Sequence, residues 1–196
     1  MAEAKARALF LDRDGIINVD RNYVYRREDF VWCDGIFELG ETALRLGYSL
    51  FVVTNQSGIG RGLYTEEDFI TLTDWMCEEM ALRSAPVQRV YHCPYHPEAR
   101  LARYRAVHPW RKPAPGMILQ ARDDFDLDLG RSILVGDRIS DMQAAVSAGV
   151  GARILVRHGD MQDQLDPPPT LIASDLREVI DWLDERDGQR TAHDPI

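Results

Sequence analysis

Ala8-Leu9-Phe10-Leu11-Asp12-Arg13-Asp14-Gly15 joins a short apolar run to two carboxylates that stand one residue apart. The apolar run predicts a buried strand that ends where the acidic pair begins. Because successive strand residues point to opposite faces, the chain must leave strand geometry near Arg13 if both carboxylates are to serve one site. Gly15 permits such a turn. The stretch therefore predicts a sheet edge that carries two carboxylates.

Further apolar runs alternate with stretches of helical periodicity. Strands are predicted at 8–12, 49–53, 87–91, 132–135 and 152–156, and helices at 36–46, 66–82, 116–125, 141–148 and 176–183. This alternation is typical of βαβ units and predicts an α/β fold, a doubly wound and mostly parallel sheet with helices on both faces. In such a sheet, ligands bind beyond the carboxyl ends of the strands.

Length and composition favour one domain. The chain has 196 residues, 45% of them hydrophobic, which is enough for one sizeable core. We expect a single domain over 1–186 and a frayed tail over 187–196. About forty residues separate Asp14 from Thr54, which leaves no room for a separate cap domain. The site should therefore be open to small phosphorylated substrates.

The charge balance excludes some partners. The chain carries 23 basic and 32 acidic residues, a net charge of −9, which argues against nucleic acid or an anionic membrane surface as a partner. No signal-like N-terminal pattern and no apolar run of about 18 residues is present, so we expect a cytoplasmic protein. Cys33, Cys77 and Cys93 are few and far apart, as is typical of reduced thiols. The sequence shows no long exposed apolar stripe that would predict a subunit interface, so we expect a monomer.

Polar residues follow two other strands and one loop. Thr54 comes after the run 49–53, Asp137 and Asp141 come after the run 132–135, and Lys112 lies in the proline-rich loop 92–114. Taken alone, each of these residues also has a purely structural explanation, as a helix cap, a loop acid or a solvated surface charge. Their joint order of acid, hydroxyl, cation and acid at one sheet edge predicts a site for phosphoryl chemistry.

These residue types suit covalent catalysis at phosphorus. Asp12 is the expected nucleophile, and Asp14 the expected proton donor and later general base. The Thr54 hydroxyl and nearby backbone N–H groups would hold phosphate oxygens. Lys112 would offset the negative charge that develops on them.

A divalent cation is expected at the same place, because two carboxylates and a phosphate repel one another. Mg²⁺ suits a site made of oxygen ligands. We expect its protein ligands to come from Asp12, from Asp14 through a backbone carbonyl, and from Asp137. Asp141 would orient these ligands.

With these motifs the chain resembles the haloacid dehalogenase (HAD) superfamily of phosphohydrolases: D-x-D-G at 12–15, the threonine at 54, the lysine at 112 and G-D-x-x-x-D at 136–141. The stretches F-L-D-R-D-G-I-I-N-V-D, V-V-T-N-Q-S-G-I-G-R-G, C-P-Y-H-P and R-K-P-A-P-G-M resemble one branch, the D-glycero-D-manno-heptose 1,7-bisphosphate 7-phosphatases. The resemblance implies Mg²⁺-dependent removal of the 7-phosphate in nucleotide-heptose synthesis for lipopolysaccharide. It also implies substrate contacts from Asp20, Arg21, Asn22, Tyr23, Asn55, Gln56, Ser57, Arg111 and Arg138. Arg111 would meet the distant 1-phosphate.

Three other functions are compatible with part of the pattern. Related histidinol-phosphate phosphatases share many of these motifs, and another small sugar phosphate is a further alternative. A signalling receiver module also uses an aspartate, a threonine and a lysine around Mg²⁺. In a receiver, however, the accepting aspartate follows a middle strand, and no aspartate follows the run 49–53 here.

The resemblance also raises the question of zinc. Members of this branch often carry a structural zinc on the long loop, and the matching positions here are Cys93, Tyr95, His108 and Trp110. Tyrosine and tryptophan are poor zinc donors, so the resemblance implies that this zinc site is lost. A rearranged set is the remaining alternative, made of Cys93, His92, His96 and His108.

Overall fold

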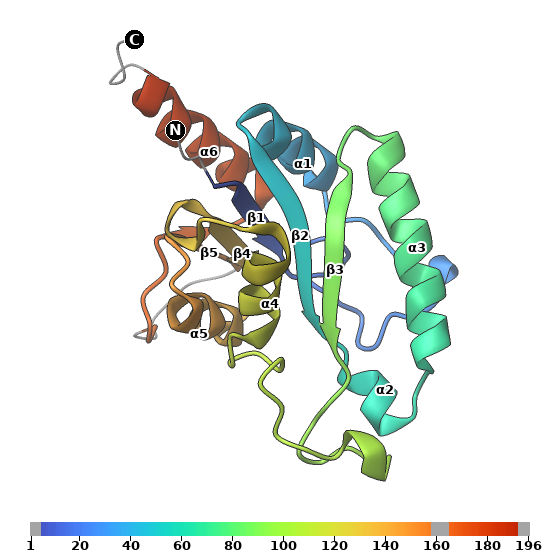
Figure 1. The fold of residues 1–196 in the computed structure, drawn as a ribbon. Helices are drawn as coiled ribbons and strands as arrows, with labels where there is room; N and C mark the ends of the chain where they lie inside the picture. The colour runs from blue at the N-terminus through green and yellow to red at the C-terminus, as the bar shows by residue number, and fades with distance from the viewer. Residues whose placement is uncertain (1–4, 158–164, 192–196) are drawn as a thin grey trace.

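A computed structural model describes residues 5–157 and 165–191, with side chains as far as Asp187. Its centre is an open sheet of parallel strands in the order β3-β2-β1-β4-β5-β6. The strands are β1 (Arg7–Leu11), β2 (Tyr48–Asn55), β3 (Val87–Cys93), β4 (Ile133–Gly136), β5 (Ala152–Val156) and β6 (Leu171–Ala173). Since all strands run the same way, their carboxyl ends share one edge (Figure 1).

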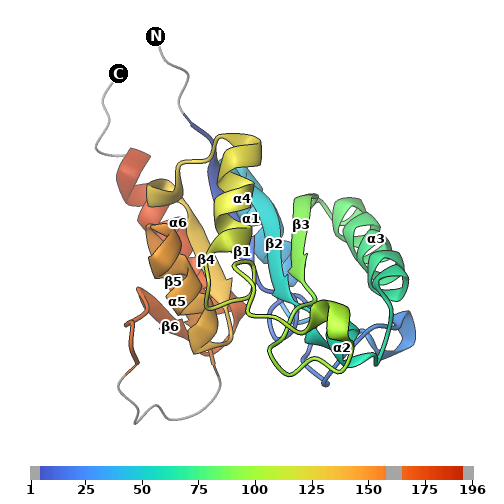
Figure 2. The ribbon, with the colours of Figure 1, turned by 60° about the horizontal axis from the view of Figure 1, so that its bottom comes forward.

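Helices cover both faces of the sheet, as Figure 2 shows. On one face lie α1 (Ile36–Arg45), α3 (Glu66–Leu82) and α6 (Leu176–Thr191), and on the other α4 (Gly116–Phe125) and α5 (Ile139–Ala148). Alternate residues of β1 supply both cores: Leu9 and Leu11 pack in the first, and Ala8 and Phe10 in the second. The predicted doubly wound α/β fold is thus confirmed.

Short elements complete the chain. The helix α2 (Ser57–Arg61) follows β2 directly at the carboxyl edge of the sheet, and 3-10 turns lie at Arg27–Asp29, Ala102–Tyr104 and Leu129–Arg131. Sequence periodicity did not predict α2 or β6, because elements of five and three residues are too short to show a period. Among the helices that the structure describes, none combines the length and apolar character needed to cross a bilayer.

The C-terminal boundary differs from the expected one. Residues 187–191, expected to belong to a frayed tail, continue α6, which ends at Thr191. Asp187, the first of these residues, is buried, and its Oδ2 lies 3.5 Å from Nη1 of Arg7. The rest of the predicted tail, 192–196, lies outside the described residues.

The start of α3 positions a residue that later matters for the site. Thr65 Oγ1 accepts a hydrogen bond from the Asp68 backbone N–H at 3.0 Å, and the Asp68 carboxylate accepts one from the Thr65 N–H at 2.8 Å. This reciprocal capping box stabilises a helix start by about 1 kcal/mol. It fixes the chain immediately after Tyr64.

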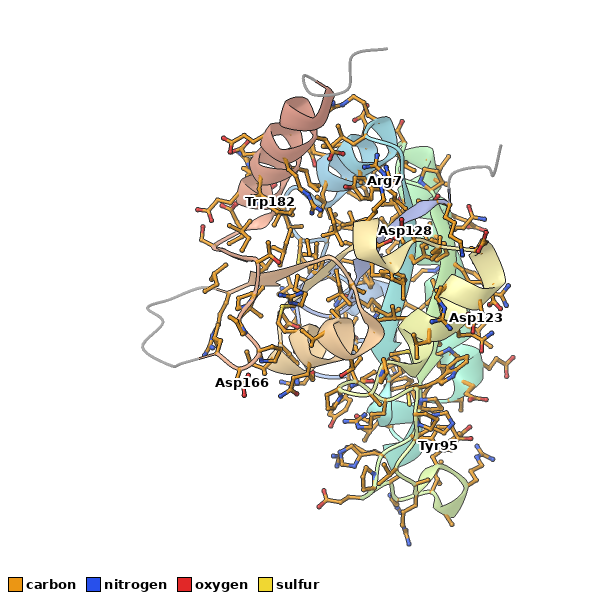
Figure 3. All side chains as sticks on the ribbon, turned by 60° about the vertical axis from the view of Figure 1, so that its left-hand side comes forward. Arg7, Tyr95, Asp123, Asp128, Asp166 and Trp182 are labelled. Atoms are coloured by element: carbon orange, nitrogen blue, oxygen red, sulfur yellow. The ribbon has the colours of Figure 1, made fainter. Side chains whose placement is uncertain are left out.

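The long loop after β3 lies at one end of the molecule (Figure 1). Figure 3 shows Tyr95 on this loop, far from Arg7 and Trp182. The loop therefore extends beyond the carboxyl edge of the sheet, where it can border a ligand site.

Candidate active site

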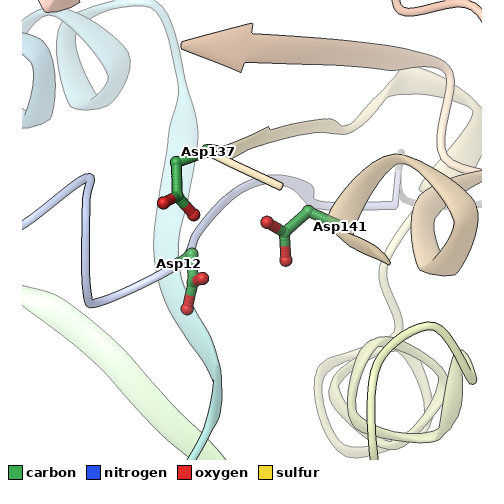
Figure 4. Close-up of side chains that lie close together, drawn as sticks. All are labelled: Asp12, Asp137 and Asp141. Atoms are coloured by element: carbon green, nitrogen blue, oxygen red, sulfur yellow. The ribbon is translucent and has the colours of Figure 1, made fainter. Parts of the chain in front are cut away.

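Strand order brings the predicted acids together. Since β1 lies between β2 and β4, the residues that follow these three strands meet at the point where the sheet order reverses. Asp12 follows β1, Asp137 follows β4 and Asp141 comes from the first turn of α5. Their carboxylates point toward one another (Figure 4), with one oxygen from each within 4.8 Å of the others.

Lys112 supplies a positive charge to this acidic cluster. Its Nζ lies 3.0 Å from Asp12 Oδ1 and 2.6 Å from Asp141 Oδ1, and it donates a hydrogen bond to the Val53 carbonyl at 2.8 Å. Asn55 holds the lysine backbone at both ends, accepting from its N–H and donating to its carbonyl, each at 3.0 Å. Asn55, expected to touch substrate, thus anchors the loop that carries Lys112.

The cluster contains more negative charge than one ammonium group balances. Burial raises the pKa of Asp12 to about 7, although Lys112 acts in the opposite direction. Burial and then the Asp141 charge raise the pKa of Asp137 to about 6. Burial disfavours the charged form of Lys112, yet the Asp12 and Asp141 carboxylates raise its pKa overall. Asp137 Oδ1 is buried without a hydrogen-bond partner.

This donor set fits Mg²⁺, which prefers oxygen ligands and would supply the missing positive charge. The turn after Asp14 also needs a glycine. Gly15 has a φ of 92°, and a Cβ at this position would lie 2.5 Å from Asp137 Oδ2, so Gly15 lets the Asp137 carboxylate lie against the turn. The carboxylate of Asp141, expected only to orient the ligands, belongs to the cluster itself.

Asp14 has a different environment. Arg13 Nη2 lies 2.9 Å from both of its carboxylate oxygens, and the side-chain amides of Asn18 and Gln56 donate to it at 3.1 Å. After Arg13 the chain turns sharply, and the Arg13 carbonyl accepts hydrogen bonds from backbone N–H groups that follow. The turn and these side-chain donors together hold the Asp14 side chain apart from the acidic cluster. Of the two carboxylates in the motif, one thus joins the cluster and the other stands beside it.

A hydrogen-bond network that was not predicted from the sequence orients the Thr54 hydroxyl. Gln56 is buried, and its Nε2 donates to Thr54 Oγ1 at 2.8 Å, while its carbonyl accepts from the Tyr64 hydroxyl at 2.6 Å. Sequence reasoning missed Tyr64, because nothing local marks a tyrosine eight residues beyond Gln56. It also missed the pairing role of Arg13, for which its place between two acids was an available signal.

The cluster opens into a cavity of about 290 Å³. Its lining comprises Asp12, Asp14, Asp20, Asn22, Tyr23, Thr54, Asn55, Gln56, Ser57, Tyr64, Arg111, Lys112, Arg138 and Ser140. Of the residues predicted to contact substrate, all except the exposed Arg21 line this cavity. Asp20 pairs with Arg138 at 2.8 Å across the rim. A larger hollow of about 690 Å³, which shares Tyr64 as a wall, contains no residue of the acidic cluster.

The rearranged zinc set does not assemble. Neighbouring strand residues face opposite ways, so His92 packs on Phe69 at 4.4 Å whereas Cys93 is buried in the second core. Burial raises the pKa of the Cys93 thiol, which opposes the thiolate that zinc requires. His96 Nδ1 accepts from the Glu98 N–H, and His108 Nδ1 from the Trp110 N–H. Within the described ranges, only the acidic cluster brings metal-ligand atoms together.

The sheet order, the acidic cluster and the neighbouring lysine define a phosphohydrolase of the HAD class. The HAD-hydrolase-like family model matches residues 109–179. A Burkholderia mallei protein named D-glycero-alpha-D-manno-heptose-1,7-bisphosphate 7-phosphatase is 52% identical over 91% of this chain and 94% of its own length. An Escherichia coli K12 protein, the corresponding beta-heptose phosphatase, is 48% identical over 78% of this chain and 80% of its own.

A solved structure agrees with these relatives. The D,D-heptose 1,7-bisphosphate phosphatase of B. bronchiseptica, complexed with magnesium and phosphate, has a TM-score of 0.76 and 29% identity, covering 92% of this chain and 99% of its own. The chain belongs to the D-glycero-D-manno-heptose-1,7-bisphosphate 7-phosphatase family of HAD-type hydrolases.

Proposed function

We propose that this protein hydrolyses the 7-phosphate of D-glycero-D-manno-heptose 1,7-bisphosphate. The observation that carries the proposal is the Asp12, Asp137 and Asp141 cluster with Lys112 paired to Asp12 and Asp141, in a chain 52% identical to a protein of that name. The cavity beside the cluster contains Arg111 and Arg138, cations that suit a substrate with two phosphates.

In the first half of the reaction, an Asp12 carboxylate oxygen attacks phosphorus. The bond to the sugar oxygen breaks, and that oxygen takes a proton from Asp14 as it leaves. The product is an aspartyl phosphate on Asp12. Gln56 holds Thr54 and Asp14 in place, while Thr54 donates its own hydroxyl proton to a phosphate oxygen.

In the second half, Asp14 accepts a proton from water, and the hydroxide oxygen attacks phosphorus. The bond to Asp12 breaks, which releases inorganic phosphate and restores the carboxylate. Lys112, with its Nζ 3.0 Å from Asp12 Oδ1, stabilises the negative charge that builds on the reacting oxygens. Dividing hydrolysis into two displacements lowers the barrier of each.

Mg²⁺ would be held by Asp12, Asp137 and the backbone carbonyl at Asp14, with Asp141 beside them. When bound, it neutralises phosphate charge and lowers the repulsion between phosphate and nucleophile. The buried, partner-free Asp137 Oδ1 is the atom that most needs such a cation.

The proposed setting is the cytoplasm, where a monomer would act on a small phosphorylated sugar. Its product would feed nucleotide-heptose synthesis for the lipopolysaccharide core. The composition and the family support this setting.

The test is steady-state kinetics with Mg²⁺ on both anomers of heptose 1,7-bisphosphate, on heptose 7-phosphate and on histidinol phosphate. Both anomers are needed because the names of the relatives include each. We expect the highest kcat/KM for one bisphosphate anomer. Equal or higher turnover of histidinol phosphate would refute the assignment, and stable phosphorylation without phosphate release would indicate a receiver module.

A further inference from the structure

Arg13 stands between the two carboxylates of the D-x-D motif and contacts both of them. Its backbone N–H donates to Asp12 Oδ1 at 2.7 Å, and its Nη2 lies 2.9 Å from each carboxylate oxygen of Asp14. The first contact holds the proposed nucleophile, and the second holds the proposed proton donor. One residue thus connects the two reacting carboxylates through its main chain and its side chain.

The Arg13 contact fixes the direction of the Asp14 side chain. Asn18 donates only to Oδ1 of Asp14 and Gln56 only to Oδ2, each at 3.1 Å. Arg13 Nη2 is equidistant from the two oxygens, so it lies opposite the Cβ–Cγ bond and sets where the carboxyl group points. The two amides then limit rotation of the carboxyl group about that direction.

The Arg13 side chain is itself held in place. It is 1% exposed, and its Nη2 also donates to the Val24 carbonyl at 2.8 Å. The guanidinium carbon lies 5.7 Å from the centre of the Phe69 ring. A buried guanidinium with contacts on several sides has little freedom to move, so it can serve as a fixed reference for Asp14.

Stability alone does not account for an arginine at this position. Within the part of the chain that the structure describes, Nε and Nη1 of Arg13 are buried without a hydrogen-bond partner. Buried donors that lack a partner destabilise the folded state. Buried ion pairs can often be replaced by apolar side chains of similar size without loss of stability. An arginine that carries this cost is therefore expected to contribute to the reaction.

The proposed reaction gives the contact a use. While Asp12 attacks phosphorus, a proton must pass from Asp14 to the leaving oxygen, and such transfers require the two oxygens within hydrogen-bond reach. A small misplacement of the donor slows the step strongly. Arg13 does not line the cavity, so it acts through Asp14 and not on the substrate.

We propose that Arg13 is a positioning residue that directs the Asp14 carboxyl group toward the leaving oxygen. The inference rests on the proposed function, in which Asp14 protonates that oxygen. It assigns to the middle residue of the motif a role that neither carboxylate can supply, the fixed orientation of the acid relative to the nucleophile.

The test compares kcat/KM, with Mg²⁺, for two aryl phosphates of similar size, phenyl phosphate and p-nitrophenyl phosphate. Phenolate is the more basic leaving group and depends more on protonation, so phenyl phosphate reports how well the acid is placed. Arg13→Met removes the donors and keeps an unbranched side chain. It should lower kcat/KM about 100-fold for phenyl phosphate and less than about fivefold for p-nitrophenyl phosphate. Heptose 1,7-bisphosphate, with a still more basic leaving oxygen, should lose at least as much as phenyl phosphate.

Arg7→Met is the matched control, because Arg7 makes the same kinds of contact at the amino end of β1. It pairs with the Asp187 carboxylate, donates to the Leu46 carbonyl and lies over the Tyr48 ring. Arg7→Met should leave the ratio of the two kcat/KM values within about twofold of the wild-type ratio. A general loss of stability would therefore not imitate the expected result.

An equal loss on the two aryl phosphates, or no loss on phenyl phosphate, would overturn the role of Arg13. If Arg13→Met does not fold, Arg13→Lys decides by the same comparison. It keeps the charge on a shorter side chain and should show a smaller loss that is still selective for phenyl phosphate.

Asp14→Asn separates this inference from the proposed function. It should show the same selective loss on phenyl phosphate as Arg13→Met. If Asp14→Asn shows no selective loss, Asp14 is not the acid, and the proposed mechanism fails together with the inference. If Asp14→Asn is selective and Arg13→Met is not, only the role of Arg13 is overturned.

Discussion

The hydroxyl of Tyr64 donates a 2.6 Å hydrogen bond to the side-chain carbonyl of Gln56, and this contact decides which end of the amide faces the site. The amide nitrogen of Gln56 can then donate to Thr54 Oγ1 and Asp14 Oδ2. Because Thr54 Oγ1 is already an acceptor, its own proton is available to a phosphate oxygen. Tyr64 thus influences Thr54 and Asp14 indirectly, through its hydrogen bond to Gln56.

Tyr64→Phe should lower kcat about 3- to 10-fold, the effect of one lost hydrogen bond within a buried network. The fold should persist, because the ring still packs between Ile59 and Phe69 in their shared core. Tyr25→Phe is the matched control, since Tyr25 stacks on Tyr64 with the ring centroids 5.1 Å apart, whereas the side-chain carbonyl of Gln56 accepts its hydrogen bond from Tyr64. Equal kcat in Tyr64→Phe and Tyr25→Phe would contradict the role of the phenol.

Asp12→Asn should abolish turnover by at least about 1,000-fold, because the amide is not a nucleophile toward phosphorus. The fold should remain, since the amide nearly matches the carboxylate in size. Rapid-quench measurements with wild type should detect a phosphorylated enzyme that Asp12→Asn does not form. Burst phosphate release from the variant would show that another residue is the nucleophile.

Stability without magnesium should fall as the pH rises from about 4 to about 7. The pKa of Asp12 is raised from its ordinary 3.8 to about 7, so the folded state binds more protons than the unfolded state in this window. Deprotonation on raising the pH therefore favours unfolding. In EDTA, the melting temperature of Asp12→Asn should rise relative to that of wild type between pH 5 and pH 7.5.

Added Mg²⁺ should reverse this loss, because an ion that binds only the folded state stabilises it. The melting temperature of wild type at pH 7.5 should rise with Mg²⁺ and change less in Asp12→Asn. A difference between the two proteins that does not vary with pH would contradict the charge-based explanation.

The long loop should keep its structure without zinc. The His108 ring stacks on Tyr95 at 4.2 Å, with the planes 6° apart, so we expect aromatic packing to organise this segment. Purified protein should contain far less than one zinc per chain, and a zinc-selective chelator should leave the melting temperature unchanged. Stoichiometric zinc that stabilises the fold would contradict this prediction.

Two variants separate packing from metal binding. His108→Phe keeps a flat ring and should melt close to wild type. His108→Ala loses a ring pair worth about 1 kcal/mol, or roughly 2–4 °C for a chain of this size. Equal destabilisation in both variants would point to a role of the imidazole nitrogens instead.

The fold was predictable from local pattern. The segments that form β1, β2 and β4 are continuous apolar runs ended by polar residues, and their alternation with helical periodicity predicts a parallel sheet. Asp12, Thr54 and Asp137 could be placed at one edge for the same reason, because parallel strands bring their carboxyl ends together.

By itself, then, the sequence determined the sheet, its functional edge and the kind of chemistry available there, since these depend on spacing along the chain. Only the tertiary structure decided how the acids divide: Asp141 joins Asp12 and Asp137, while Arg13 and Gln56 hold Asp14 beside them. That division depends on a turn geometry and on contacts between residues as far apart as Asp12 and Asp141. Such contacts form when helices and loops pack, and no local periodicity encodes them.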